Sequence, residues 1–182
     1  MGTWSTRGLR GSGLEDLINY TIESLREKKL AVIQKVPTPI TPIEIDKQTR
    51  HITLAYFDQK STVDYVGAVQ GIPVCFDAKE SAENTFSLQN IHPHQVAFMR
   101  EFEQQDGIAF FLIYYKKIEK YYYLPLRHFL PFWERAQNGG RKSFRFDELD
   151  ATFVLPAKHG VIIPYLEMIN KDLSERDDTP EN

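Results

Sequence analysis

Residues 61–80 strongly constrain the local structure of the chain. Two short apolar runs in this stretch flank the pair Gln70-Gly71, which is a hairpin signal. Side chains alternate along a strand, so the second run places Asp77 and Lys79 on one face and four apolar residues on the other: Ile72, Val74, Phe76 and Ala78. The apolar face is typical of a core. The acid and the amine, about 7 Å apart on the opposite face, indicate a candidate site.

Asp64 lies near the start of the first run and can face this pair across the hairpin. Twelve residues separate Asp64 from Asp77-Ala78-Lys79, which is the arrangement of the PD-(D/E)xK nucleases. Two carboxylates can hold a hard divalent cation, and the lysine can serve the attacking water. A charged, solvated strand face produces the same pattern by chance. The motif alone therefore leaves both interpretations open.

Length and composition suit one compact domain. The chain has 182 residues, 42% of them hydrophobic, which is enough for a core of its own. The single cysteine, Cys75, cannot form an internal disulfide and favours a reducing, cytoplasmic setting. We expect no membrane span and no signal peptide, because no long apolar segment or leader is seen. The net charge of −3 is compatible with DNA binding but does not predict it.

Both ends of the chain are expected to lie outside the folded domain. Residues 1–13 are rich in Gly, Ser and Thr and carry Arg7 and Arg10, so they read as a flexible basic arm. That arm either follows a phosphate backbone or is simply disordered. Residues 175–182 are expected to form a disordered acidic tail. This leaves residues 14–174 as a single domain without internal repeats.

A helix is predicted over residues 14–29. Its apolar residues recur at helical spacing, and Ser12 is a plausible N-cap with Glu15 three residues on. Glu15 lies at the edge of the apolar stripe, which suits a carboxylate leaning over a sheet toward a metal site. The capping box explains the same residue equally well. The apolar stripe consists of Leu14, Ile18, Ile22 and Leu25.

A projecting β-ribbon is predicted after a strand at residues 30–36. Prolines at 37, 39 and 42 forbid a helix and favour an extended path. The ribbon has its turn at residues 46–50, and the whole stalk spans about residues 40–58. Such an excursion buries little by itself, so it should project or pair with a partner. Its basic residues could face phosphates, although a solvated tip would need them as well: Lys47, Arg50, His51 and Lys60.

The next segment is interpreted as a polar loop at residues 81–90 followed by a helix that opens at His92-Pro93. Gln95 falls on the buried stripe of that helix, so its amide needs a partner. The amide could point at the site, but backbone groups at the sheet end are the preferred partners. His92 and His94 suggest zinc, but no further ligand sits at suitable spacing nearby, so zinc is rejected.

The second half of the chain completes the sheet. Residues 107–115 are apolar on both faces and predict a central strand, with residues 120–124 as its neighbour. The tyrosine run at 121–123 fits half-buried packing better than base stacking. Helices are predicted at residues 127–137 and 161–173. The loop between them holds a second candidate phosphate contact: Arg141, Lys142 and Arg145.

The chain resembles the RecU-type Holliday junction resolvases, also called the penicillin-binding protein-related factor A family. The resemblance runs from about Arg7 through Leu149, and it rests on separated motifs that occur in order. One motif would mean little, but the ordered series is specific. The motifs are Arg7-Gly8, Leu14-Glu15-Asp16, AVIQKVPTPI at 31–40, LAYF at 54–57, STVDYVG at 61–67, FDAKE at 76–80, LQNIHPHQ at 88–95 and NGGRKSFRFDEL at 138–149.

This resemblance implies an α/β fold with a restriction-endonuclease-like core, in which helices flank a mixed central sheet and the ribbon forms a stalk near the junction centre. It also implies a homodimer that cleaves four-way DNA junctions by paired symmetric nicks, with Mg²⁺ as cofactor and Mn²⁺ as a substitute. A recombinase is a conceivable further partner, and no membrane is involved.

The family's active site uses a helix-borne acid, a Thr-x-Asp and a Glu-x-Lys. Carried over, the implied catalytic residues are Lys79, Glu15, Thr62, Asp64 and Asp77. The implied metal ligands are Thr62, Asp64, Asp77 and Gln95. The candidate DNA contacts are the basic residues Arg7, Arg10, Lys35, Lys47, Arg50, Lys60, Arg141 and Lys142.

Two departures and two alternatives accompany this interpretation. Asp77 stands where the family usually has glutamate, so the backbone or the ion must shift to keep the ligand distance. The wider superfamily uses either acid, so activity is still expected. The ribbon is also less basic than in the family, which bears on junction selectivity. The alternatives are another PD-(D/E)xK nuclease acting on duplex or flap DNA, and a junction-binding recombination accessory protein whose site has decayed.

Overall fold

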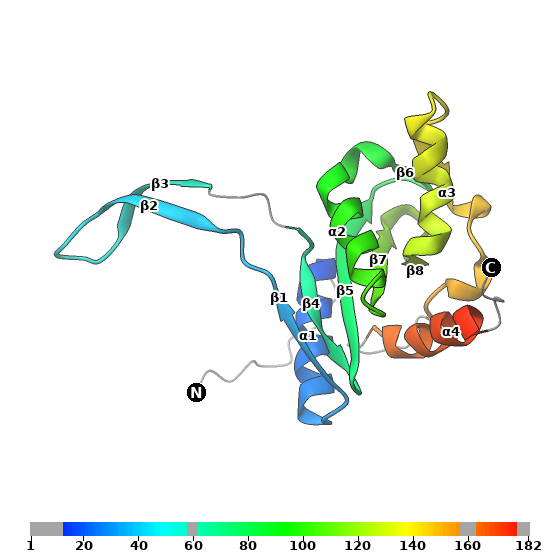
Figure 1. Cartoon of the computed structure of the whole chain (residues 1–182), viewed down its shortest axis with the longest axis horizontal. Helices are drawn as coiled ribbons and strands as arrows, with labels where there is room; N and C mark the ends of the chain where they lie inside the picture. The colour runs from blue at the N-terminus through cyan, green and yellow to red at the C-terminus, as the bar shows by residue number, and fades with distance from the viewer. Residues whose placement is uncertain (1–12, 58–61, 157–162, 178–182) are drawn as a thin grey trace.

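A computed structural model of the chain describes residues 13–57, 62–156 and 163–177. Helices flank a central five-stranded sheet from which a two-stranded ribbon projects (Figure 1). This arrangement confirms the mixed α/β fold class expected from the sequence. In spatial order the sheet consists of β1 (Ala31–Lys35), β4 (Tyr65–Val69), β5 (Ile72–Ser81), β7 (Ile108–Tyr115) and β8 (Lys120–Pro125).

The sheet is mixed because one connection crosses over. β4 is antiparallel to both β1 and β5, whereas β5 and β7 are parallel, and β8 returns antiparallel to β7. The predicted hairpin is present as β4 and β5. Gln70 and Gly71 both have positive φ, at 48° and 90°, as a type I′ turn requires. The β5–β7 crossover contains helix α2, as a parallel pair needs.

Four helices cover the two faces of the sheet in the described part of the chain. Helices α1 and α4 lie on one face, where Thr21 of α1 accepts the Ile163 amide and Tyr165 of α4 packs on Phe76. Helices α2 and α3 lie on the other. None of these helices is long and apolar enough to cross a membrane. Their bounds are α1 Leu14–Glu27, α2 Pro93–Glu103, α3 Leu126–Gln137 and α4 Tyr165–Asp177.

Helix α1 shows the predicted buried stripe, because Leu14, Ile18, Ile22 and Leu25 are all buried. Its start differs from the prediction. The N-cap is Gly13, which makes no side-chain cap, and Ser12 lies outside the described residues. The capping box expected from the sequence is therefore not the device that begins this helix.

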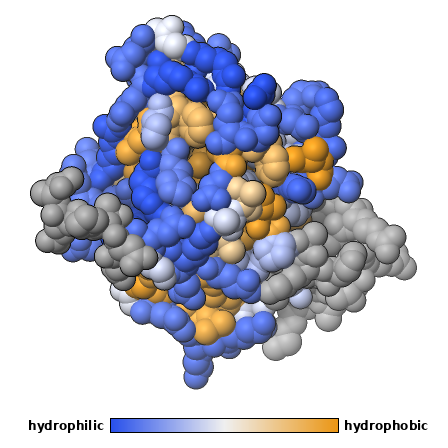
Figure 2. Space-filling view, turned by 90° about the vertical axis from the view of Figure 1, so that its right-hand side faces the viewer, coloured by the Kyte–Doolittle hydropathy of each residue, from blue (hydrophilic) through white to orange (hydrophobic). Residues whose placement is uncertain are grey.

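The ribbon consists of β2 (Ile40–Ile45) and β3 (Ile52–Phe57), paired antiparallel. The Asp46 carboxylate accepts the amides of Gln48 and Thr49 and so fixes the predicted turn. Figure 1 shows the ribbon extending well away from the sheet. It carries many exposed apolar side chains: Ile40, Ile43, Ile45, Ile52, Leu54, Tyr56 and Phe57. By contrast, hydrophilic residues cover most of the opposite side of the molecule (Figure 2).

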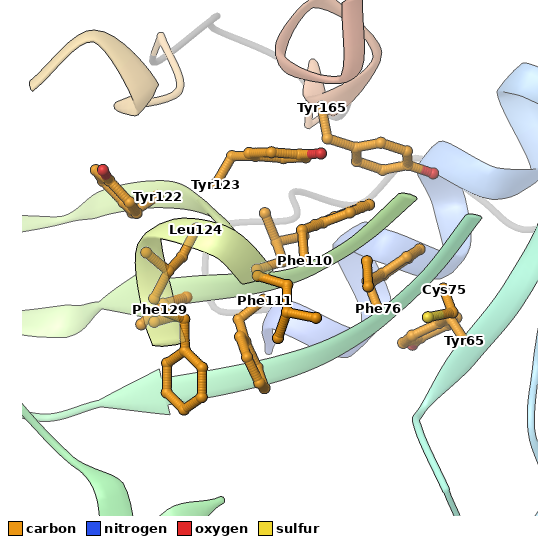
Figure 3. Close-up of a cluster of buried hydrophobic side chains, with 14 of the residues drawn as sticks. Tyr65, Cys75, Phe76, Phe110, Phe111, Tyr122, Tyr123, Leu124, Phe129 and Tyr165 are labelled. Carbon is orange, nitrogen blue, oxygen red and sulfur yellow. The ribbon is translucent and has the colours of Figure 1, made fainter. Parts of the chain in front are cut away.

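Aromatic rings fill the core on the face that α4 covers (Figure 3). Tyr65, Phe76, Phe110 and Tyr123 come from four neighbouring strands and stack in a row, with ring centroids 4.2–4.7 Å apart. On the other face Phe111 packs against Phe129 of α3. Stacked rings of this kind contribute beyond the area that they bury. Tyr122 and Tyr123 are fully buried, so packing is the correct interpretation for these two residues.

Two predicted boundaries are wrong. Residues 81–90 are not a polar loop, because β5 continues to Ser81 and β6 (Thr85–Ser87) pairs with β9 (Ser143–Arg145) through the stacked rings of Phe86 and Phe144. The last helix extends to Asp177, past the predicted start of the tail at residue 175. Short 3₁₀ turns connect the remaining segments: η1 Leu88–Asn90, η2 Lys116–Ile118, η3 Phe146–Glu148 and η4 Ala151–Phe153.

Candidate active site

The hairpin β4–β5 brings two aspartates side by side. Tyr65 pairs with Phe76, so Asp64, just before β4, lies opposite Asp77 in β5. The Asp64 amide donates a hydrogen bond to Oδ1 of Asp77 at 3.0 Å, and the Ala78 amide donates one to Oδ2 of Asp64 at 2.9 Å. Each carboxylate is thus held by the backbone of the other strand. This reciprocal pairing ties the two acids to each other through main-chain donors.

Asp77 is fully buried, which excludes the interpretation of a solvated strand face. The Lys79 Nζ lies 2.5 Å from its Oδ2, and only 19% of the Lys79 side chain is exposed. Burial and the neighbouring Asp64 charge raise the pKa of the Asp77 carboxyl to about 7, while Lys79 opposes that rise. Two carboxyl groups and one lysine therefore share a site in which Asp77 is shielded from solvent and Asp64 and Lys79 are partly buried.

Gln95 ties this site to the start of helix α2. Its Nε2 donates to Oδ2 of Asp77 at 2.8 Å, and its Oε1 accepts the amide of His92 at 2.9 Å. The side chain is buried, and both ends of its amide have a partner. The preferred prediction, backbone groups at the sheet end, is therefore wrong: one end of the amide meets the backbone of the α2 N-cap, and the other end points at the site, as the alternative had it. The other end orients the Asp77 carboxylate.

Two other predicted residues lie at the margin. Glu15 forms an ion pair with Lys35, and its side chain is 59% exposed, so the structure places it with the end of β1. Thr62 is half-buried and precedes Asp64 by two residues. The structure thus gathers Asp64, Asp77, Lys79 and Gln95, and it does not bring the Glu15 carboxylate into that cluster.

Among the described residues, no three His, Cys, Asp or Glu side chains surround one candidate metal position. The adjacent carboxyl groups of Asp64 and Asp77 nevertheless fit Mg²⁺. This ion is usually bound by one or two carboxylates, with waters and substrate phosphates filling its other positions. A buried carboxyl whose pKa is raised by a neighbouring acid is also a place where a divalent cation would relieve repulsion. The donor set is therefore compatible with the expected cofactor.

The predicted DNA contacts lie in several places. Lys47 and Arg50 are exposed at the ribbon turn, and Lys142 is exposed after α3. Arg141 pairs with Glu148, in the same way that Lys35 pairs with Glu15. Arg145, in β9, pairs with Asp147 at 2.9 Å. Arg7, Arg10 and Lys60 lie outside the described residues.

One structural acid was missed by sequence reasoning. Glu80, directly after Lys79, accepts the Leu14 amide at 3.0 Å and lies 2.5 Å from the Lys116 Nζ. Both partners are far from it in the sequence. The only sequence signal was the glycine at position 13, which has no side chain to accept an amide of the helix that follows.

Comparisons with known proteins give a consistent result. The family model for recombination protein U, RecU, matches residues 9–171. The Holliday junction resolvase RecU of Listeria welshimeri is 39% identical over 171 residues, which cover 91% of this chain and 85% of the relative. The protein of the same name from Limosilactobacillus reuteri is 37% identical over 172 residues, covering 92% and 84%.

Among solved structures, the Holliday junction resolvase Hjc of Archaeoglobus fulgidus matches with a TM-score of 0.36 and 12% identity. The match covers 60% of this chain and 72% of that chain. This likeness is too weak to carry an argument.

Proposed function

The chain belongs to the recombination protein U (RecU) family, and from this premise we propose that it is a nuclease that resolves four-way (Holliday) DNA junctions in recombination and repair. One observation carries the chemical part of this proposal. Asp64, fully buried Asp77 and Lys79 meet at the hairpin, and Gln95 orients the central acid. This grouping suits hydrolysis of a phosphodiester bond.

The proposed reaction is attack of water on phosphorus: a new P–O bond forms, the P–O bond to the leaving sugar oxygen breaks, and the proton lost by the water is balanced by the proton that the sugar oxygen gains. Lys79, whose Nζ lies 2.5 Å from Oδ2 of Asp77, would orient the attacking water by a hydrogen bond or take its proton. Asp64 and Asp77 would hold Mg²⁺, or Mn²⁺ in its place, and Thr62 would help to position a ligand or the scissile phosphate. When bound there, the ion neutralises charge that builds on the non-bridging phosphate oxygens. Glu15 would support the ion directly or through water.

A homodimer is part of the proposal, and the ribbon supports it. Ile52, Leu54 and Tyr56 share one face of β3, and Ile45 lies opposite Ile52 on β2. All four are about half exposed. A two-stranded ribbon is marginal by itself, and an apolar surface of this kind usually marks an interaction site. A twofold dimer would present two sites that match the pseudo-twofold of a four-way junction, which accounts for paired nicks.

Cleavage of a labelled four-way junction beside a matched linear duplex tests this function. We expect paired, symmetric nicks in the junction only, abolished by EDTA. Lys79→Ala should lower the cleavage rate at least about 100-fold while junction binding persists, because the lysine acts on the reacting water. Lys117→Ala is the matched control, since Lys117 also pairs with a carboxylate at 2.5 Å but lies outside the site.

The alternatives predict different outcomes of the same experiment. Cleavage of the linear duplex at the same rate as the junction would indicate a PD-(D/E)xK nuclease that acts on duplex or flap DNA. Junction binding without cleavage in either Mg²⁺ or Mn²⁺ would indicate an accessory protein with a decayed site.

A further inference from the structure

Helix α1 begins without a side-chain cap of its own. The first amides of a helix lack partners within it, and the N-cap residue Gly13 has no side chain to supply one. The Leu14 amide instead donates to Oε1 of Glu80 at 3.0 Å, from a residue 66 positions further along the chain. Glu80 lies in β5. The helix is therefore capped by the strand that carries Asp77 and Lys79.

Glu80 is itself held in place. Its Oε2 lies 2.5 Å from Nζ of Lys116 in η2, and its side chain is only 33% exposed. Lys116 and the Leu14 amide lower the pKa of the Glu80 carboxyl, so it is ionised at neutral pH. A negative charge suits the positive end of a helix dipole. Glu80 also follows Lys79 directly, so it points to the opposite face of β5, where α1 packs.

The capped turn carries a residue with a proposed role in the reaction. Glu15 follows Leu14 directly, so any fraying of the first turn moves the Glu15 backbone relative to β5. We propose that Glu80 is a positioning residue for DNA cleavage: by capping α1 from β5, it holds Glu15 at a fixed place relative to Asp64 and Asp77. This inference rests on the proposed function, in which Glu15 supports the metal ion. In this proposal Glu80 acts through the first turn of α1 and makes no contact of its own with the ion or the DNA.

Three variants distinguish the effect of the hydrogen bond from the Leu14 amide to Glu80 from the effect of losing a negative charge. Glu80→Ala removes both contacts, whereas Glu80→Gln keeps an oxygen for the Leu14 amide and loses only the charge. Glu83→Ala is the matched control, because exposed Glu83 makes the same kind of ion pair at 2.5 Å with the next lysine, Lys117. Hydrogen–deuterium exchange reports the first turn directly. Its amides should exchange about tenfold faster in Glu80→Ala, to an intermediate extent in Glu80→Gln, and at the wild-type rate in Glu83→Ala.

The functional readouts are Mn²⁺ affinity and junction-cleavage kinetics. In Glu80→Ala we expect Mn²⁺ affinity and kcat each to fall about tenfold, with KM for the junction within about twofold of wild type. Glu80→Gln should recover most of this loss. In a Glu15→Ala background, Glu80→Ala should have no further effect on Mn²⁺ affinity, because the cap acts through Glu15. A general loss of stability would instead add to the Glu15→Ala effect.

Several outcomes overturn the proposal. An unchanged first turn in Glu80→Ala would remove its premise. A loosened first turn with wild-type Mn²⁺ affinity and kcat would reduce Glu80 to a structural cap. If Glu80→Ala does not fold, Lys116→Ala removes the ion pair alone and should give the Glu80→Gln result. A wild-type protein that binds Mn²⁺ but cuts nothing would refute the nuclease, while the variants' Mn²⁺ affinities would still decide the positioning role. A wild-type protein that binds no Mn²⁺ would refute both.

Discussion

At the scale of single residues, the candidate site depends on Asp77, which is hydrogen-bonded by the Asp64 amide within the hairpin and by Gln95 from helix α2. The proximity of Asp64, Asp77 and Lys79 could be predicted from the sequence, because the position of a hairpin turn determines which residues of its two strands face each other. The burial of Asp77 could not be predicted in this way, because Gln95, which covers it, comes from helix α2 in the crossover that follows β5. For the same reason the cap from Glu80 to Leu14 joins residues too distant for any local pattern.

Among substitutions that leave both aspartates in place, loss of the Gln95 side chain should disturb the site most. Gln95→Ala leaves the buried Asp77 carboxylate without one donor, and it also removes the acceptor of the amide of His92, which is an exposed residue. Unsatisfied buried groups cost about 1–3 kcal/mol, so we expect the free energy of unfolding to fall by about that amount in urea titrations. Exposed Gln89→Ala should change it by less than about 0.5 kcal/mol. Equal effects of the two variants would contradict this account of Gln95.

At the scale of elements, long periodic segments were predicted well and short ones were not. The stripe of α1, the central strand β7 and the ribbon β2–β3 each contain enough residues to reveal a period. Strand β6 has three residues and exists only because β9 pairs with it, so no local signal predicts it. The end of α4 was misplaced because its acids look like a tail in composition. Asp172 is in fact buried and hydrogen-bonded by Tyr123.

Arg176 should therefore matter more than its place near the chain end suggests. It pairs with Asp172 at 3.1 Å and with Glu103, and its Nη1 donates to the Gly107 carbonyl, so it links α4 to α2 and to the start of β7. Removing Arg176 takes the cation from Glu103, whose side chain is only 20% exposed, and leaves buried Asp172 with Arg127 as its remaining cation. We expect Arg176→Ala to lower the free energy of unfolding by about 2–4 kcal/mol in urea titrations. Arg26→Ala, which breaks an exposed pair with Glu23, should cost less than about 1 kcal/mol.

At the scale of the whole molecule, the core and the ribbon differ in how much of their apolar surface is buried within one chain. The core buries stacked aromatics from four strands and can account for its own stability. The ribbon exposes apolar side chains on a hairpin that packs against little else, which a stable monomer rarely tolerates. Sequence reasoning could predict that the ribbon projects, but not which of its faces is apolar, because irregular pairing near Pro42 and Glu44 alters the register there.

A substitution on the apolar face of β3 can test the proposed dimer while leaving the pairing of β2 with β3 intact. Leu54 pairs across the ribbon with Glu44, so Leu54→Lys gains an opposite charge on its neighbouring strand while it interrupts the stripe formed by Ile52 and Tyr56. We expect the dimer dissociation constant to rise at least about 100-fold in analytical ultracentrifugation, because a lysine must be desolvated at the interface. Paired nicking of the junction should be lost together with the dimer. Thr53→Lys, on the other face of β3, should leave both unchanged. A Leu54→Lys protein that remains dimeric would place the subunit interface somewhere other than this face.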